Sequence, residues 1–141
     1  MHKLQAGVED YLLTAVLRGI LAQRLVRRLC TQCRQEADAP ADLIRRFDLD
    51  RRSEGRPVKI WHPVGCPQCR NTGFRGRQAI VEFLVPDANI DRLVFARADH
   101  LEIERAAIAG GMVPMFSAGL DAALAGVTTI EEVVRSIRSE G

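Results

Sequence analysis

Two Cys-x-x-Cys pairs constrain the fold of this sequence more than any other feature. They are Cys30/Cys33 and Cys66/Cys69, and the chain of 141 residues has no other cysteine. One such turn places two sulfurs on an edge of a tetrahedron. Two turns complete the four-thiolate shell in which Zn²⁺ is bound, with Zn–S distances of about 2.3 Å. The chain must therefore fold back so that its two pairs meet.

The segment between the pairs predicts a small lobe. Residues 34–65 separate the pairs, and this gap is longer than the roughly 15–20 residues usual in zinc ribbons. We therefore expect residues 30–69 to fold as a separate lobe around a structural metal. Four cysteines fill the shell, so the histidines His2, His62 and His100 are expected in surface or packing roles.

Other uses of the cysteines stay open at this point. Two disulfides need an oxidising compartment, which nothing in the sequence indicates. A redox Cys-x-x-Cys motif is usually single, whereas the doubled motif favours a metal. The preference for zinc over iron rests on ligand type alone. Iron stays an alternative, because a rubredoxin-like iron site uses the same four cysteines. Nearby arginines can offset the negative charge of such a site: Arg27, Arg28, Arg34 and Arg70.

Composition sets broader limits. Hydrophobic residues make up 47% of the chain and aromatic residues 5%, so the core of one domain or two small ones must be mostly aliphatic. The net charge of +2 argues neither for nor against nucleic acid. The N-terminus lacks a signal-peptide pattern, and arginines interrupt the most apolar stretch, residues 11–29. We therefore expect a cytoplasmic protein.

The apolar pattern predicts an α+β fold that is mostly α-helical. Residues 11–29 favour a helix that is apolar on nearly all sides in its first half, which implies burial in a larger body or an oligomer. Thr128 or Thr129 is expected to cap the last helix, with a glutamate three residues on completing a capping box. The other expected elements are helices at 41–47, 88–96, 101–109 and 116–125, a turn at 53–57, a short strand at 58–61 and a buried strand at 78–85.

Three separate motifs carry a family resemblance. They are Leu21-Ala-Gln-Arg-Leu-Val-Arg-Arg-Leu-Cys30-Thr-Gln-Cys33, the stretch from Cys66 to Glu82 with its Gly-Phe-Arg-Gly-Arg turn, and Thr128-Thr-Ile-Glu-Glu-Val-Val134. In this order they resemble the zinc lobe and the Thr-Thr-x-x-Glu-Val signature of type II secretion assembly ATPases and their type IV pilus-assembly relatives. The resemblance runs from about Gly7 to Arg138.

The resemblance implies the C-terminal third of such a motor. The chain has no Gly-x-x-x-x-Gly-Lys-[Ser/Thr] phosphate loop and no acidic strand end for magnesium. We expect it not to hydrolyse ATP alone, with ATP and Mg²⁺ bound only in the intact parent. The implied regions are residues 1–29 as a helical remnant of the nucleotide-binding domain, 30–69 as the zinc lobe, 70–86 as the Arg-Gly-Arg turn and strand, and 87–141 as a C-terminal helical subdomain.

The resemblance also implies a role for Arg77. In the hexameric family motor, the second arginine of the turn faces the nucleotide and is thought to sense or stabilise the γ-phosphate. The alternative is that Arg75 and Arg77 solvate the turn or pair with Glu82. The implied partners are other copies of the parent ATPase and inner-membrane secretion platform proteins, at the cytoplasmic side of the inner membrane, where the motor powers type II protein secretion.

A stand-alone zinc-ribbon adaptor for nucleic acid or a protein partner is the competing hypothesis. Arginines cluster near the cysteines, but acidic residues are interleaved with them. Only Trp61 and Phe74 offer nearby stacking surfaces, which makes nucleic acid an unfavoured partner. A chaperone-type cysteine-rich domain is less favoured still, because it carries more repeats at shorter spacing.

Overall fold

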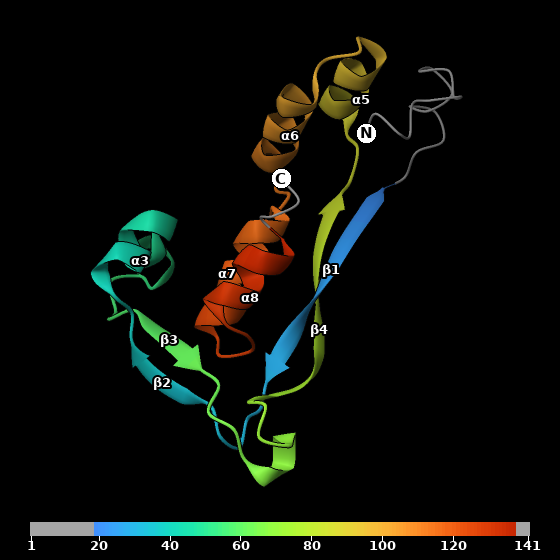
Figure 1. Ribbon diagram of the computed structural model, residues 1–141. Coiled ribbons are helices and arrows are strands. Elements are labelled where there is room, and N and C mark those ends of the chain that lie inside the picture. Colours follow the sequence, from blue (N-terminus) through green and yellow to red (C-terminus); the bar gives the residue numbers. More distant parts are fainter. Residues whose placement is uncertain (1–18, 138–141) are drawn as a thin grey trace. The chain divides into compact units, whose positions relative to one another are not determined.

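The computed structural model describes residues 19–137 of the chain and shows an α+β protein (Figure 1). Its strands pair as two separate two-stranded sheets, β1 with β4 and β2 with β3. The elements in chain order are β1 (Ile20–Leu29), β2 (Gln35–Asp38), α3 (Ala41–Phe47), α4 (Leu49–Arg52), β3 (Lys59–His62), the 3-10 turn η1 (Pro67–Cys69), β4 (Phe74–Leu84), α5 (Ala88–Phe95), α6 (His100–Ala109), α7 (Met115–Leu124) and α8 (Ile130–Ser136).

The described chain divides into two compact units that are discontinuous in sequence. One, here called the lobe unit, comprises residues 23–80 and 115–137, and the other, the α5–α6 unit, comprises 19–22 and 81–114. Strands β1 and β4 each contribute to both units. The regions expected from the resemblance instead follow one another along the chain.

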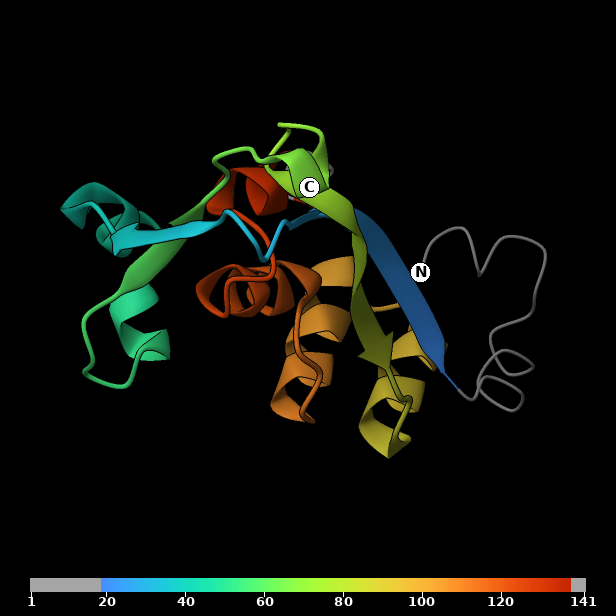
Figure 2. The same ribbon diagram turned by 90° about the horizontal axis from the view of Figure 1, so that it is seen from below.

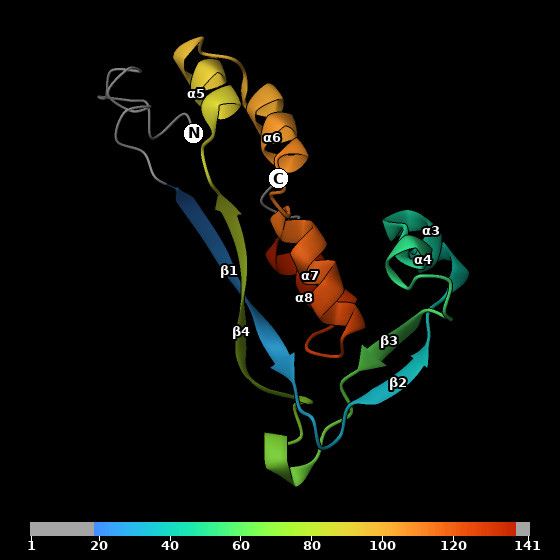
Figure 3. The same cartoon turned by 180° about the vertical axis from the view of Figure 1, so that it is seen from behind.

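Within the lobe unit, helices α7 and α8 lie between two diverging β-ribbons (Figures 1 and 3). Leu49 and Val133 are fully buried in its core, and Phe47 contacts Phe116 with ring centroids 5.8 Å apart. The β2–β3 ribbon is antiparallel, with Gln35 opposite His62. Seen from below, β1 leads through a short connection into β2 (Figure 2), and the first cysteine pair lies in this connection. The cysteines therefore lie where the two ribbons meet.

The α5–α6 unit has a small aliphatic core of its own, formed by Ile90, Val94, Ile103 and Ala107. Each of its helices is capped at its N-terminus by an aspartate, one of the residue types preferred at this position. Asp87 accepts the Ile90 N–H at 2.8 Å, and Asp99 accepts the Glu102 N–H at 2.9 Å. None of the helices in residues 19–137 is long and apolar enough to cross a membrane.

The prediction of a helix at 11–29 is wrong for residues 20–29, which form strand β1; residues 11–18 lie outside the described part of the chain. Periodicity alone cannot distinguish a short apolar run in a strand from one in a helix. The predicted strand at 78–85 begins earlier, at Phe74, and is not buried on both faces. Val81 is 45% and Phe83 52% exposed, because only one face of the ribbon is covered.

Most other predicted elements are confirmed to within a residue or two. Helix α3 matches its expected range, and Phe47 is buried on its inner face. Thr129 caps α8 by accepting the Glu132 N–H at 3.1 Å. The Glu132 carboxylate is bonded to Arg27 rather than to the start of its own helix.

Candidate metal centre

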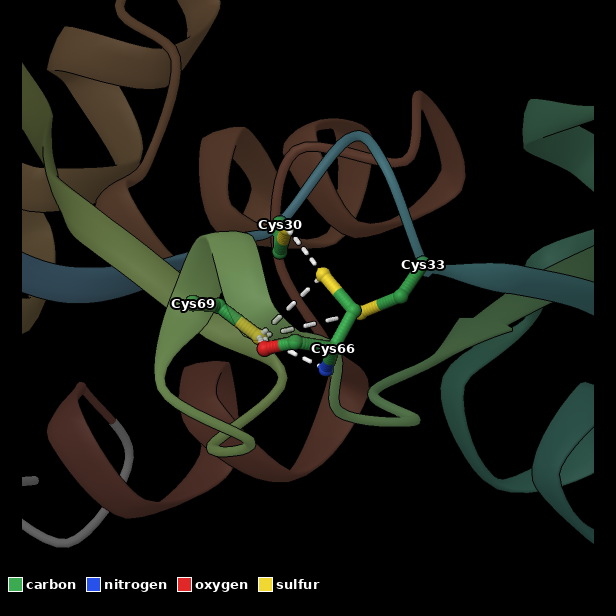
Figure 4. A group of neighbouring side chains, drawn as sticks. All are labelled: Cys30, Cys33, Cys66 and Cys69. Carbon is green, nitrogen blue, oxygen red and sulfur yellow. Dashed lines mark hydrogen bonds between the residues drawn. The ribbon is translucent and has the colours of Figure 1, made fainter.

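The four cysteine side chains converge on one point (Figure 4). Their sulfurs all lie within 4.8 Å of one another. The Sγ–Sγ distances are 3.8 Å for Cys30–Cys66 and Cys66–Cys69 and 3.9 Å for Cys33–Cys69. Among residues 19–137, this is the one group of Cys, His, Asp and Glu with ligand geometry for a metal ion.

These distances fit a tetrahedral thiolate site. Four sulfurs at about 2.3 Å from a central ion are separated by about 3.8 Å along each edge. A disulfide needs sulfurs about 2.05 Å apart, so the cluster does not have the geometry of two disulfides. Four soft ligands in a tetrahedron suit Zn²⁺ or iron rather than Mg²⁺ or Ca²⁺. The residues present therefore fit the metal that the sequence predicts.

Backbone N–H groups around the second pair point at the sulfurs. Gly73 N–H donates to Cys69 Sγ at 3.1 Å, and Cys66 N–H donates to the same sulfur at 3.3 Å. Gly65 N–H donates to Cys33 Sγ at 3.3 Å. Hydrogen bonds of this kind stabilise the charged thiolate that a metal requires.

The thiol pKa values reflect this environment. Burial raises the pKa of Cys66 to about 11. Burial also opposes ionisation of Cys69, but N–H donors from Cys66 and Gly73 outweigh it and bring the pKa of Cys69 down to about 6. Of these two thiols, Cys69 is therefore the more readily ionised. A cation at the centre favours ionisation of Cys66.

The loop that follows Cys69 permits this geometry only with glycine at position 73. Gly73 has φ of 83°, and a Cβ there would lie 2.3 Å from the Pro63 Cβ. Arg70 and Asn71 also have positive φ, and the Thr72 hydroxyl donates to Cys69 O at 2.7 Å.

The arginines of the Arg-Gly-Arg turn and the described histidines do not belong to the group of possible metal ligands. Arg75 and Arg77 are exposed on β4, on either side of Gly76, whose φ is 77°. His62 and His100 are exposed, and His2 lies outside the described residues. The nucleotide role of Arg77 stays a prediction.

Sequence reasoning missed the contacts of Glu132, a buried carboxylate on α8. Its side chain is 3% exposed, and it accepts from the Arg27 backbone N–H at 3.0 Å and from Arg27 Nε at 2.7 Å. Burial opposes its charge, but the hydrogen bonds from Arg27 and the nearby Arg135 hold the pKa of Glu132 below its ordinary value. Its place in the Thr-Thr-x-x-Glu motif is the available signal, but the same pattern predicts a helix cap.

Comparison with known proteins shows the family to which the chain is related. A model of the type II/IV secretion system protein family matches residues 1–135. The chain is 46% identical to type II secretion system protein E of Xanthomonas campestris over 132 residues. This alignment covers 94% of this chain and 23% of that protein. It is 39% identical to type IV pilus assembly ATPase TfpB of Acinetobacter baylyi, over 97% of this chain and 23% of that protein.

A third relative is type IV pilus assembly ATPase PilB of Thermus thermophilus, 38% identical over 92% of this chain and 14% of that protein. The chain thus spans a quarter or less of the length of these three relatives. Because the family model covers nearly all of its residues, the chain belongs to the type II/IV secretion system protein family.

Proposed function

We propose that this chain is the C-terminal part of a hexameric ATPase that powers type II protein secretion or the related assembly of pili. The observation that supports this proposal best is that four cysteine sulfurs lie within 4.8 Å of one another in a chain of this family. The relatives named as ATPases are several times longer, and no phosphate loop occurs in this sequence. The chain is therefore inactive as an ATPase on its own and works within a longer parent.

Zinc is the proposed metal, held by Cys30, Cys33, Cys66 and Cys69. With all four positions taken by thiolates, a bound Zn²⁺ supplies structural cross-linking and no open site for chemistry. It ties the ends of both ribbons of the lobe unit together. The proposed regions are a remnant of the nucleotide-binding domain at 1–29, the zinc lobe at 30–69, the turn and strand at 70–86 and the helical subdomain at 87–141. Within the first of these regions, residues 20–29 form strand β1.

Arg77 is the proposed nucleotide-sensing residue of the parent, which binds ATP and Mg²⁺. Its exposed guanidinium offers parallel donors that match phosphate oxygens. The proposed partners are further copies of the parent and the inner-membrane secretion platform, reached from the cytoplasmic side.

Metal analysis and an ATPase assay test the proposal together. Mass spectrometry of the purified chain should find one zinc per chain, lost when Cys66 and Cys69 are replaced by serine, and the chain should not turn over ATP. A metal-free chain would refute the zinc lobe. Measurable ATP turnover that survives further purification would refute the assignment as a part without its own active site.

Arg77 needs a separate experiment in a full-length relative of the family. The substitution equivalent to Arg77→Gln should reduce ATP turnover by about 10³-fold, as loss of a phosphate-stabilising arginine does. The equivalent of Arg75→Gln is the matched control. Equal losses in the two variants would count against a specific role for Arg77.

A further inference from the structure

The turn between α7 and α8, residues 126–129, contacts the chain on both sides of the first cysteine pair. Before the pair, Leu29 N–H donates to Val127 O at 2.8 Å. After the pair, the Arg34 guanidinium donates to Gly126 O and stacks on the Trp61 ring, 4.4 Å from its centroid. One short turn, distant in sequence, therefore brackets Cys30 and Cys33.

The turn is shaped for this close approach at Gly126. Its φ is 83°, a conformation that side chains other than glycine rarely adopt. A Cβ there would lie 2.6 Å from Arg34 Nη1 and 3.0 Å from the Trp61 ring. The backbone of the turn can thus reach Arg34 only because residue 126 has no side chain.

The same turn also holds the edge of β1 just before the cysteines. The Thr128 hydroxyl donates to Arg27 O at 2.7 Å, and the Glu132 carboxylate accepts the Arg27 N–H at 3.0 Å. Both side chains are buried, and both are more than 100 positions away from Arg27 in sequence. The turn and Glu132 therefore bond both backbone groups of Arg27, as a third strand would.

The alternating direction of the backbone groups along β1 connects the hydrogen bonds of Arg27 to the position of Cys30. Alternate residues of a β-strand direct their backbone groups to the same edge. Arg27 and Leu29 face the α7–α8 turn, whereas the Cys30 N–H is directed the other way and donates to Gly73 O at 3.0 Å. The end of β1 next to Cys30 is therefore held by the α7–α8 turn on one side and by Gly73 on the other.

We propose that the α7–α8 turn together with Glu132 is a clamp that positions Cys30 and Cys33 for the metal. This inference rests on the proposed zinc site. Groups that orient metal ligands typically change metal affinity 10–100-fold when they are removed. Because coupling is reciprocal, bound metal must stabilise the turn by the same free energy with which the turn favours metal binding.

Competition for zinc against a chromophoric chelator measures the effect in the purified full chain. Glu132→Gln and Arg34→Met should each weaken zinc binding about tenfold. Glu131→Gln, at an exposed neighbouring position on the same helix, should bind zinc as the unchanged chain does. The visible spectrum of the Co²⁺-loaded Glu132→Gln variant should also show a distorted tetrahedral site, which a loss of overall stability alone does not cause.

Val133→Ala separates the clamp from general destabilisation, because Val133 is fully buried on α8. An equal loss of zinc affinity in Val133→Ala, at a similar loss of melting temperature, would overturn the inference. An unchanged zinc affinity in both Glu132→Gln and Arg34→Met would also overturn the inference, but it would not count against the proposed zinc site. Absence of zinc binding in the unchanged chain would overturn both. Arg34→Met leaves α8 intact and carries the test if Glu132→Gln does not fold.

Discussion

At the scale of single residues, Gly73 joins the two halves of the cysteine cluster. Its N–H donates to Cys69 Sγ at 3.1 Å, and its carbonyl accepts the Cys30 N–H at 3.0 Å. Its positive φ and the nearby Pro63 leave no room for a side chain. The cluster therefore depends on a residue that is not itself a ligand.

We expect Gly73→Ala to destabilise the protein more than Gly55→Ala does. Both glycines have φ near 80°, at 83° and 81°, so both substitutions incur the cost of a left-handed conformation, about 1–2 kcal/mol. Nothing lies within 4 Å of a Cβ at position 55, whereas the contact with Pro63 adds an overpacking cost of about 1–3 kcal/mol at position 73. Urea unfolding of both variants measures the difference, and equal losses would contradict this account of Gly73.

Arg77→Gln should leave the stability of the chain unchanged within about 0.5 kcal/mol, as is usual for exposed positions. This result separates the nucleotide role from a structural pairing of Arg77 with Glu82, because an arginine in such a pair contributes to folding. Thermal unfolding of Arg77→Gln and Arg75→Gln is the measurement. A clear loss of stability in Arg77→Gln would favour the structural reading over the nucleotide role.

At the scale of elements, the β2–β3 ribbon is too short to be stable alone. Each of its strands has four residues, and an isolated two-stranded hairpin is at best marginally stable in water. Its support comes from the cysteine cluster at one end and from α7, which contacts β3. The lone tryptophan of the chain, Trp61, lies on β3 and reports on this support.

Removal of the metal should therefore shift Trp61 fluorescence to longer wavelength, as the ring loses Arg34 and becomes hydrated. Metal-binding energy is folding energy in small sites. The Cys66→Ser/Cys69→Ser variant should show the shifted emission without chelator. Unchanged emission in that variant, with an unchanged circular dichroism spectrum, would contradict a folding role for the metal.

The elements also show how far sequence alone reaches. The meeting of the four cysteines followed from ligand chemistry and spacing, and the Thr129 cap followed from local capping rules. Strand β1 did not follow, because its partners are distant: β4 pairs along one edge, and Thr128 and Glu132 hold Arg27 on the other. An apolar run carries no local sign that distant side chains will form hydrogen bonds to its backbone. The apolar pattern of residues 20–29 therefore predicts a helix where the structure has a strand.

At the scale of the whole molecule, the two compact units should respond differently to the metal. The cysteines, α7 and α8 all belong to the lobe unit, and the α5–α6 unit has a separate core. Hydrogen exchange with and without chelator should show faster exchange of amides in β2, β3 and α8, with little change in α5 and α6. Uniform loss of protection across both units would contradict this division.

X-ray absorption at the zinc edge of the purified chain tests the central claim most directly. The account predicts zinc surrounded by four sulfurs at about 2.3 Å, with no nitrogen or oxygen ligand. An iron edge in place of zinc would keep the four-cysteine site and change its metal. Absence of any metal, or a shell containing nitrogen or oxygen, would contradict the four-cysteine metal centre on which the proposed function rests.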